Sequence, residues 1–344
     1  MAANVPEPSR LLSVQSHVVS GYVGNRSATF PLQLLGWDVD VINTVQFSNH
    51  TGYGRWKGLR FDDSHISSLF QGLEENGLLK QSRMLSGYMP SPSVVQAVLE
   101  AVERIREVNP ELIYLCDPVM GDMGRGMYVD KEVLPVYRSM LRYTTIITPN
   151  QFEAQILADE EITSIPSLLS VLQSLHTQGA NHVLITSVSL SDTDILKIGA
   201  TPSSEPSMVL VGSSRPSTDT PLKPWFIQFP EVRGYFSGVG DLFAAMTLGR
   251  FQNLTAQDVE AETSVTPIAR AAELAVAVVQ AVLAKTQKSM DALEQEVTEG
   301  SSGDDAQARV DRMRGRELKI IQSKREIENP EVAYQAKFFK ETSG

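Results

Sequence analysis

The chain has 344 residues, 42% of them hydrophobic and 21% charged, so it can bury a large core and is not globally disordered. Its 30 Lys and Arg residues against 41 Asp and Glu residues give a net charge of −11. This balance argues against a nucleic-acid-binding protein, which binds phosphates mainly through Lys and Arg. The length fits either two average domains or one large α/β domain.

Signals for secretion or membrane insertion are not apparent in the sequence. The N-terminal segment MAANVPEPSR lacks the charged start and long apolar stretch of a signal peptide. No apolar run approaches the roughly 18 residues that a membrane-spanning helix requires. The single cysteine, Cys116, cannot form an intrachain disulfide. We therefore expect a cytoplasmic protein in a reducing compartment, with no membrane partner.

Short apolar runs of strand length alternate with stretches of helical spacing along most of the chain. In chain order, we expect strands over residues 11–15, 39–44, 83–86, 112–116, 144–148, 182–186, 208–212 and 225–229. We expect helices over residues 25–35, 93–107, 150–158 and 165–176, from about residue 240, and over 267–285. The loop after the first strand carries Ser16, and Gly36 is a suitable stop for the first helix. The alternation predicts right-handed βαβ units and an α/β fold, with a mainly parallel sheet covered by helices on both faces.

Polar stretches interrupt this pattern. Residues 201–207 and 213–224 are rich in Ser and Pro, and residues 291–305 are acidic and polar before a basic stretch that runs to Arg325. We expect a disordered leader over residues 1–9, flexible insertions at 201–207, 213–224 and 288–314, and a solvated basic face. Apolar character returns near residues 320 and 338, which predicts a C-terminal segment packed on a single domain spanning residues 10–340.

The strongest local signal is Gly238-Val239-Gly240-Asp241, followed by the apolar stretch LFAAMTLG. Glycines before a helix leave backbone N–H groups pointing outward at its positive end, where an anion can bind. An Asp in the first turn could accept a proton from a substrate hydroxyl while these N–H groups stabilise a transferring phosphoryl group. Because the pattern is short, Asp241 could equally cap the helix while the glycines form a turn.

Polar residues also follow several of the expected strands. Asp117 and Asp122 lie in CDPVMGD, after the 112–116 strand, and could hold a hydrated Mg²⁺ or form an Asp-Pro turn. Asn150 and Glu153 have the spacing of a capping box, a fully structural explanation. Thr186 and Ser187 end another expected strand. Because open α/β sheets bind ligands at the carboxyl ends of their strands, we expect these loops to share one site.

Several other catalytic motifs are missing. The sequence has no G-x-x-x-x-G-K-[ST] phosphate-binding loop and no G-x-S-x-G nucleophile elbow. The glycines of GYVG and GDMGRG do not complete a dinucleotide fingerprint. The five histidines have no metal-ligand spacing, which favours structural roles except for His50, in the unusual stretch FSNHTGYG.

Several long stretches, in the same order, resemble one enzyme family. They are LLSVQSHVVSGYVGNRSATFPLQLLGWDVDVINTVQFSNHTGYGRWKG, YLCDPVMGD, MYV, IITPNQFEAQIL, VLITS, GVGDLFAAM and IIQSKREIENPEV. They closely resemble pyridoxal kinases from about residue 10 to 335, most weakly over 190–230 and 286–316. The resemblance implies a ribokinase-like three-layer α/β sandwich and a homodimer. It also implies ATP-dependent phosphorylation of the 5′-hydroxymethyl group of pyridoxal, pyridoxine or pyridoxamine.

The resemblance also implies roles for individual residues. Asp241 corresponds to the catalytic base, and the anion hole would be formed by Gly238, Val239 and Gly240. The implied vitamer contacts are Ser16 and Thr51 on the ring, Val23, Phe47 and Tyr88 as walls with His50 and Trp56 nearby, and Tyr128 of a flap. The implied ATP contacts are Asp117, Asn150, Glu153, Thr186, Ser187 and Val232. The implied cation ligands are Asp122 for Mg²⁺, and Asp117, Thr148, Glu153 and Thr186 for K⁺ or Na⁺.

The chain departs from the family pattern in three places. Val239 stands where the family often has threonine, which removes a hydroxyl contact to ATP phosphate but keeps the backbone donor. The flap, DMGRGMYV, is shorter than in animal members, and the polar insertions have no family role. Two alternatives stay open: a related ribokinase-like kinase for hydroxymethylpyrimidine or a sugar, and a non-catalytic protein that binds vitamin B6.

Overall fold

The structure, a computed structural model, describes residues 9–204, 206–215, 221–232, 234–252, 266–297 and 305–340. The expected leader over residues 1–9 therefore falls almost entirely outside the described residues. The strands are β1 (Arg10–Val18), β2 (Asp38–Phe47), β3 (Gly58–Arg60), β4 (Arg83–Ser86), β5 (Ile113–Cys116), β6 (Gly121–Asp122), β7 (Gly126–Met127), β8 (Ile146–Ile147), β9 (His182–Val188), β10 (Ser207–Ser214), β11 (Trp225–Pro230) and β12 (Lys337–Phe338).

Ten of these strands form one sheet in the order β12-β11-β10-β9-β8-β5-β4-β1-β2-β3, while β6 and β7 form a separate hairpin. The six strands from β9 to β2 in that order pair in parallel. The strands β3 and β10 to β12 extend the two edges of the sheet antiparallel to their neighbours. The prediction of a mainly parallel central sheet is confirmed.

Helices cover both faces of this sheet. The α-helices are α1 (Asn25–Leu34), α2 (Asp63–Glu75), α3 (Pro92–Val108), α4 (Val133–Met140), α5 (Gln151–Ala158), α6 (Ile165–Gln178), α7 (Asp192–Ile198), α8 (Val239–Arg250), α10 (Pro267–Val297), α11 (Asp305–Gly315) and α12 (Lys324–Glu328). The 3₁₀ turns are η1 (Thr51–Tyr53), η2 (Leu141–Tyr143) and η3 (Ile321–Ser323).

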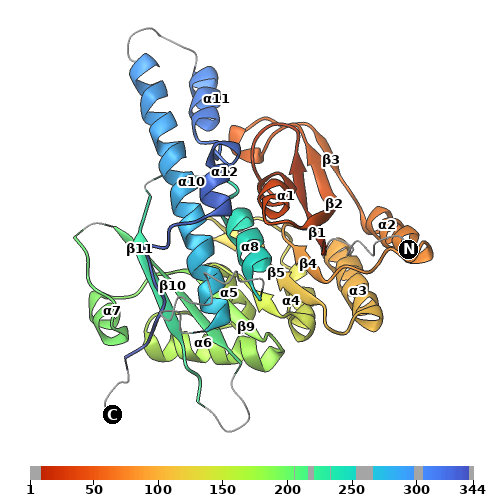
Figure 1. Ribbon diagram of the computed structural model, residues 1–344, viewed down its shortest axis with the longest axis horizontal. Helices are drawn as coiled ribbons and strands as arrows, with labels where there is room; N and C mark the ends of the chain where they lie inside the picture. Colours follow the sequence, from red (N-terminus) through yellow and green to blue (C-terminus); the bar gives the residue numbers. More distant parts are fainter. Residues whose placement is uncertain are drawn as a thin grey trace, which may run out of the picture.

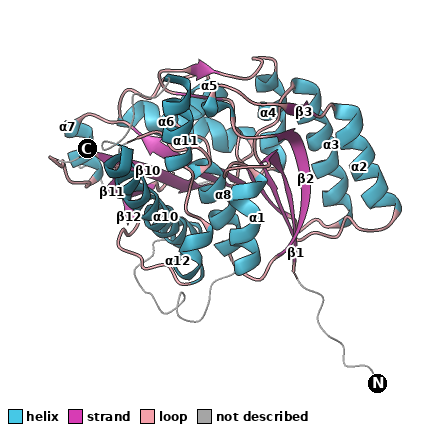
Figure 2. Cartoon of the chain, turned by 90° about the horizontal axis from the view of Figure 1, so that it is seen from above, coloured by secondary structure: helices cyan, strands magenta, loops and turns pink. Residues whose placement is uncertain are grey.

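Two apolar cores separate the sheet from the helices on its two sides. One core joins the sheet to α2, α3, α4 and α6 through buried residues such as Phe70, Val98, Tyr137 and Leu172. The other joins it to α1, α8 and α10 through residues such as Leu32, Met246 and Val278. Figure 2 shows the sheet between these two helical layers. The expected three-layer α/β fold is therefore confirmed.

Helix α10 forms the long axis of the second layer (Figure 1). Its buried residues Ala271, Ala275, Val278 and Val282 recur at helical spacing and contact the sheet side of the molecule. Over 267–291 the helix is long and apolar enough to cross a membrane, contrary to the expectation that no apolar stretch approaches this length. Because 67% of that stretch is buried inside the fold, we interpret α10 as a core helix.

The structure differs from several expected boundaries. Ser16 lies inside β1 and not in the following loop, because β1 pairs with β2 as far as Val18. The stretches 288–297 and 305–314, expected within a flexible insertion, are helical and belong to α10 and α11, while residues 298–304 lie outside the described residues. Of the two Ser/Pro-rich stretches, residues 207 and 213–214 belong to β10, while residues 205 and 216–220 are not described.

Candidate active site

Loops from successive strands meet at one edge of the sheet, as expected from their order. Asp117 directly follows β5, and a Cβ added to Gly240 at the start of α8 would lie 3.9 Å from its Oδ2 atom. Thr148 follows β8, and its N–H donates to Cys116 O at 3.1 Å. Thr186 N donates to Pro149 O at 2.9 Å. The strand ends β5, β8 and β9 are thus joined to the N-terminus of α8.

The glycine turn before α8 has the geometry that an anion site requires. Gly238, the N-cap, has φ +84, and a Cβ there would collide with Tyr22 O, so the position requires glycine. The Asp241 side chain makes no capping hydrogen bond to its own helix, which contradicts the capping alternative. Instead, Asp241 Oδ2 accepts a hydrogen bond from Gly24 N–H at 2.8 Å. Asp241 therefore links the glycine turn to the β1–α1 loop.

Burial changes the acidity of Asp241. Burial raises the pKa of this carboxyl above its ordinary value, and the hydrogen bond from Gly24 N–H only partly offsets the rise. A carboxylate with a raised pKa holds a proton more readily at neutral pH. This property is typical of a general base that must accept a proton from an alcohol.

Asp117 and Glu153 place two more buried carboxyls beside Asp241. Burial raises the pKa of Asp117 well above its ordinary value, and the charges of Glu153 and Asp241 raise it further. Burial raises the pKa of Glu153 to about 8, although three backbone N–H groups, those of Met120, Asn150 and Gly121, donate to it. This edge of the sheet therefore concentrates carboxyl groups whose ionised forms are disfavoured by burial and by one another.

Asn150 connects this cluster to the β6–β7 hairpin. The capping box predicted for Asn150 and Glu153 is present at the start of α5, so the structural explanation of the spacing is confirmed. The Asn150 side-chain amide also donates to Gly121 O at 2.7 Å and to Asp122 Oδ1 at 3.3 Å. The same residue thus begins a helix and orients the carboxylate that the resemblance assigns to Mg²⁺.

The expected flap consists of this hairpin and the residues that follow it. Tyr128 comes directly after β7 and is 49% exposed, and burial of its hydroxyl together with the charges of Glu153 and Asp122 raises its pKa. The guanidinium of Arg125 lies 4.1 Å from the centroid of the Tyr235 ring, which stands in the loop before α8. The hairpin therefore contacts the start of α5 through Asp122 and the loop before α8 through Arg125.

The residues expected to form the walls of a ring-binding site are brought together. Val23 and Tyr88 pack against a small buried cluster of Val18, Val45 and Phe47, separate from the two main cores. The Trp56 ring lies 6.4 Å from the Phe47 ring between centroids. Thr51 is exposed in η1, and Ser16 Oγ lies against Gly24, whose N–H binds Asp241. The apolar cluster therefore borders the carboxylate that the sequence identified.

Other predicted contacts stay predictions. Thr186 and Ser187 lie half-buried inside β9, and Val232 and Val239 pack half-buried against the core around α8. These positions lie near the strand ends described above. Their side chains have no contact that identifies a bound nucleotide.

The side chains at this edge of the sheet offer oxygen atoms that could bind cations. Within the described ranges, no group of three or more His, Cys, Asp and Glu side chains could hold a metal ion alone. Thr148 Oγ1 is buried and makes no hydrogen bond of ordinary length within the described part of the chain, but it faces the Asp117 carboxyl and lowers the pKa of that group. Hydroxyl, carbonyl and carboxylate oxygens are the ligands of hard cations, and Mg²⁺ commonly uses few carboxylates plus phosphate oxygens. The residues therefore fit cations that are completed by a bound phosphate group.

Glu317 was not predicted as a site residue, and it is partly buried in the stretch expected to be a solvated basic face. It accepts hydrogen bonds from Tyr22 N–H and the Tyr53 hydroxyl and pairs with His50. The nearest sequence signal was the C-terminal motif IIQSKREIENPEV, which begins at Ile320, three residues after Glu317. By contrast, His176 is structural as predicted, since its ring nitrogens bind Ala180 O and Ser213 Oγ.

Comparisons with known proteins relate the chain to kinases, and its near-full-length relatives are pyridoxal kinases. A family model described as phosphomethylpyrimidine kinase matches residues 81–206. The chain is 40% identical over 337 residues to the pyridoxal kinase of Sus scrofa, covering 95% of each chain. It is 37% identical over 331 residues to the pyridoxal kinase of Arabidopsis thaliana, covering 96% of this chain and 94% of that one.

A solved structure extends this similarity to three dimensions. The pyridoxal kinase from Leishmania donovani in complex with ADP and pyridoxamine superimposes with a TM-score of 0.77 at 30% sequence identity. The match covers 96% of this chain and 100% of that chain. Near-complete coverage by sequence and by structure, together with the ordered strand-end motifs, shows that this chain belongs to the pyridoxal kinase family.

Proposed function

We propose that this chain transfers the γ-phosphoryl group of ATP to the 5′-hydroxymethyl group of pyridoxal, pyridoxine or pyridoxamine. The observation that carries the proposal is the position of Asp241. Its carboxylate lies at the glycine turn of α8 and binds Gly24 N–H, beside Ser16 and the apolar cluster that includes Phe47. An acceptor alcohol held by that cluster would meet both a base and an anion site.

The reaction follows from this placement. Asp241 takes the proton of the hydroxymethyl group. The hydroxymethyl oxygen forms a bond to the γ-phosphorus, and the bond between the γ-phosphorus and the oxygen that bridges to the β-phosphate breaks. The N–H groups of residues 238–240 stabilise the charge on the transferring group. The hairpin carrying Tyr128 covers the reacting groups and excludes water, which limits hydrolysis of ATP.

Cations are part of the proposal. Bound Mg²⁺ and K⁺ supply positive charge that neutralises the ATP phosphates. Asp122, oriented by Asn150, would hold Mg²⁺. Asp117, Glu153, Thr148 and Thr186 would surround the monovalent cation. The buried hydroxyl of Thr148, which faces Asp117, and the raised pKa of Glu153 support this assignment, because both groups gain from a nearby cation.

Two further expectations rest on the resemblance. We propose that the protein is a homodimer located in the cytoplasm. Sedimentation of the purified chain tests the first statement, and localisation of a tagged chain tests the second. If the chain sediments as a monomer, the proposal of a homodimer is wrong, while the chemistry proposed for Asp241 is unaffected.

An assay of pyridoxal 5′-phosphate formation tests the activity. The full chain is incubated with ATP and Mg²⁺, with and without K⁺, and with pyridoxal, pyridoxine, pyridoxamine, hydroxymethylpyrimidine or a sugar as acceptor. We expect phosphorylation of the B6 vitamers and activation by K⁺. Preference for hydroxymethylpyrimidine or a sugar would favour a related kinase. Tight vitamer binding without an ATP-dependent product would favour a non-catalytic binding protein.

A further inference from the structure

Glu317, just after α11, joins two loops that belong to the proposed vitamer site. Its carboxylate accepts hydrogen bonds from the Tyr53 hydroxyl at 2.9 Å and from Tyr22 N–H at 3.0 Å, and its Oε1 lies 3.3 Å from His50 Nε2. Tyr22 lies in the β1–α1 loop, whereas His50 and Tyr53 belong to the η1 turn that contains Thr51. One side chain from the C-terminal segment thus binds both loops.

The His50 ring continues this connection to the glycine turn. Because its Nε2 faces a carboxylate, Nδ1 is the acceptor nitrogen, and it lies 3.2 Å from Gly52 N–H. The same Nδ1 lies 3.4 Å from Ser237 Oγ, directly before Gly238. The carboxylate, the imidazole and the serine hydroxyl therefore link the C-terminal segment to the proposed anion hole.

The two loops have glycines where the C-terminal side chains approach them. A Cβ on Gly21 would collide with the Glu317 carboxylate, and a Cβ on Gly54 would lie 2.9 Å from the Arg309 guanidinium carbon. Arg309 of α11 also donates to Gly52 O at 3.1 Å. The η1 turn therefore has a conformation that fits α11 and Glu317 closely.

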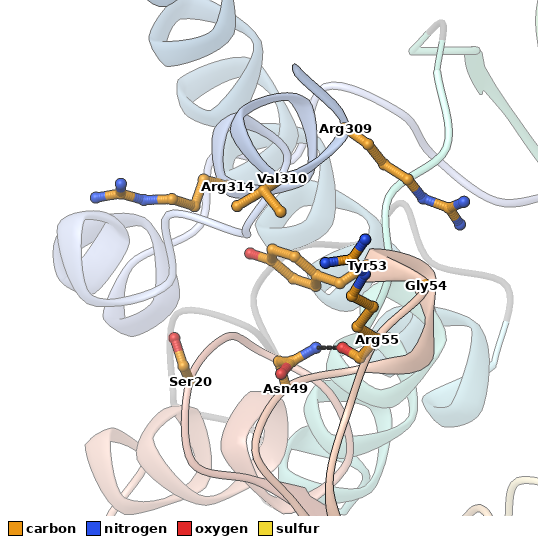
Figure 3. A pocket seen from close by; sticks show the side chains of 8 residues that line it. All are labelled: Ser20, Asn49, Tyr53, Gly54, Arg55, Arg309, Val310 and Arg314. Carbon is orange, nitrogen blue, oxygen red and sulfur yellow. Dashed lines mark hydrogen bonds between the residues drawn. The ribbon is translucent and has the colours of Figure 1, made fainter. Parts of the chain in front are cut away.

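Figure 3 shows this contact from the side of a cavity of about 600 Å³. The Tyr53 ring lies beneath Val310 of α11, and Arg55 extends beside it. The side chains of Arg309 and Arg314 point in opposite directions, so they do not converge on a common anion. The contact between α11 and η1 is thus better explained as support for the turn than as a second anion-binding site.

The charge of Glu317 is stabilised in this position. Burial alone raises the pKa of this carboxyl, but the hydrogen bond and charge of His50, with hydrogen bonds from Tyr53 and Tyr22, lower it below its ordinary value. The carboxylate is therefore ionised at neutral pH and binds its donors strongly, since hydrogen bonds to charged groups are stronger than neutral ones.

We propose that Glu317 is a positioning residue for vitamer binding. Through His50 and Tyr53 it holds the η1 turn, and through Tyr22 N–H it holds the β1–α1 loop, so that Thr51 and Ser16 face the same ring. The inference rests on the proposed function for the identity of the ligand. It assigns the C-terminal segment, just after one of the two stretches of weakest family resemblance, a role in the affinity for the vitamer.

Three variants of the full chain test the proposal: Glu317→Ala, Glu317→Gln and Tyr53→Phe. Calorimetry measures the Kd for pyridoxal, and steady-state assays measure kcat and the KM values for pyridoxal and ATP. We expect Glu317→Ala, which removes every hydrogen bond to the carboxylate, to raise the pyridoxal Kd and KM about tenfold. Tyr53→Phe removes one of these bonds and should raise them about threefold. The KM for ATP should stay unchanged. Glu317→Gln should restore most of the affinity, because its amide oxygen still accepts from His50 and Tyr53.

A matched control and the opposing outcomes complete the experiment. Glu326→Gln changes a carboxylate on α12 that pairs with Lys285 away from these loops, and it should leave the pyridoxal Kd unchanged. Unchanged Kd and KM for pyridoxal in a folded Glu317→Ala would overturn the positioning role. If that variant does not fold, an unchanged Kd in Tyr53→Phe overturns it instead. A wild-type chain that phosphorylates no vitamer would refute the proposed function, which is a separate outcome.

Discussion

Two carboxyl groups in the protein, those of Glu153 and Glu317, have pKa values that are shifted in opposite directions. Glu153 is 3% exposed and the Glu317 side chain is 13% exposed, and each accepts several hydrogen bonds. The pKa of Glu153 is nevertheless raised to about 8, whereas that of Glu317 is lowered. Burial is the largest cause of the raised pKa of Glu153, which is fully buried, whereas Glu317 is only partly buried.

Neighbouring groups also contribute to the difference between the two pKa values. Glu153 has backbone N–H donors, and the nearby Asp122 carboxylate raises its pKa further. Glu317 accepts hydrogen bonds from the His50 imidazole, the Tyr53 hydroxyl and Tyr22 N–H, and these lower its pKa. Neutral donors do not offset the burial of a charge that lies next to other negative charges. The Glu153 region is therefore suited to receive cations with a ligand, whereas Glu317 is fully partnered within the protein.

The largest expected effect comes from Asp241, which belongs to the carboxyl cluster with Asp117 and Glu153. Asp241→Asn should lower kcat roughly 10²–10⁴-fold, the contribution of a positioned general base. Folding should be preserved, because the amide oxygen can still accept from Gly24 N–H and burial of a charge is avoided. Turnover and thermal unfolding measure the two effects.

The control for Asp241 is Asp194→Asn. Asp194 lies in α7, where it binds Ser191 and Lys197. This change removes an aspartate charge from a partnered position, and turnover should stay near the wild-type value. Turnover of Asp241→Asn within tenfold of wild type would contradict its assignment as the base.

The second-largest expected effect concerns the binding of a monovalent cation by the carboxyl cluster. Thr148→Val removes a buried hydroxyl that faces the Asp117 carboxyl but makes no hydrogen bond of ordinary length among the described residues. We expect the K⁺ concentration for half-maximal activity to rise about tenfold, while the free energy of unfolding without K⁺ rises by about 1 kcal/mol. Activity titrations with K⁺ and urea unfolding measure these changes.

Thr247→Val is the matched control for Thr148. Thr247 in α8 is also fully buried with an unpartnered hydroxyl, but it lies in the core around Met246 and Leu248. It should show the same gain in stability without a change in K⁺ activation. Equal K⁺ titrations for Thr148→Val and wild type would remove Thr148 from the cation site.

Much of the fold could be predicted because its signals are local. The strand β4 and helix α5 agree with the expected ranges, since apolar runs and a capping box mark them directly in the sequence. Helix α2 was missed because Ile66 and Phe70 are the buried residues in a mostly polar stretch. The edge strand β12 pairs with β11 through two residues, and such a pairing depends on tertiary packing that no local pattern shows.

The active site was predictable for the same reason, and only in part. Asp117 and Asp241 each follow a glycine- or strand-marked boundary, so their positions in the sequence indicate their place at the sheet edge. Glu317 has no such mark. Its bond to Tyr22 joins residues 295 positions apart, and the surrounding basic residues suggested a solvated surface. Contacts of this separation follow from the packed structure and not from local periodicity.

A smaller effect concerns the stability of the partnered carboxylate. Because the pKa of Glu317 is lower in the folded state than its ordinary value of 4.5, its charge stabilises the fold above that pH. This contribution is lost as the pH falls through the folded-state value. Glu317→Gln should therefore lower the free energy of unfolding by about 1–2 kcal/mol at pH 7 and by less at pH 4. Urea unfolding at several pH values measures the difference, and a pH-independent difference would contradict the role of the charge.

The smallest effect comes from a carboxylate that is partnered but exposed. Glu326 Oε2 lies 2.7 Å from Lys285 Nζ, with side chains 32% and 35% exposed, and its pKa is lowered by that hydrogen bond. Because solvent screens such pairs, Glu326→Gln should lower the free energy of unfolding by less than about 1 kcal/mol, and high salt should remove the difference. Urea unfolding at low and high salt measures it. A loss as large as that of Glu317→Gln would show that a partner alone, without burial, determines the contribution of a carboxylate in this fold.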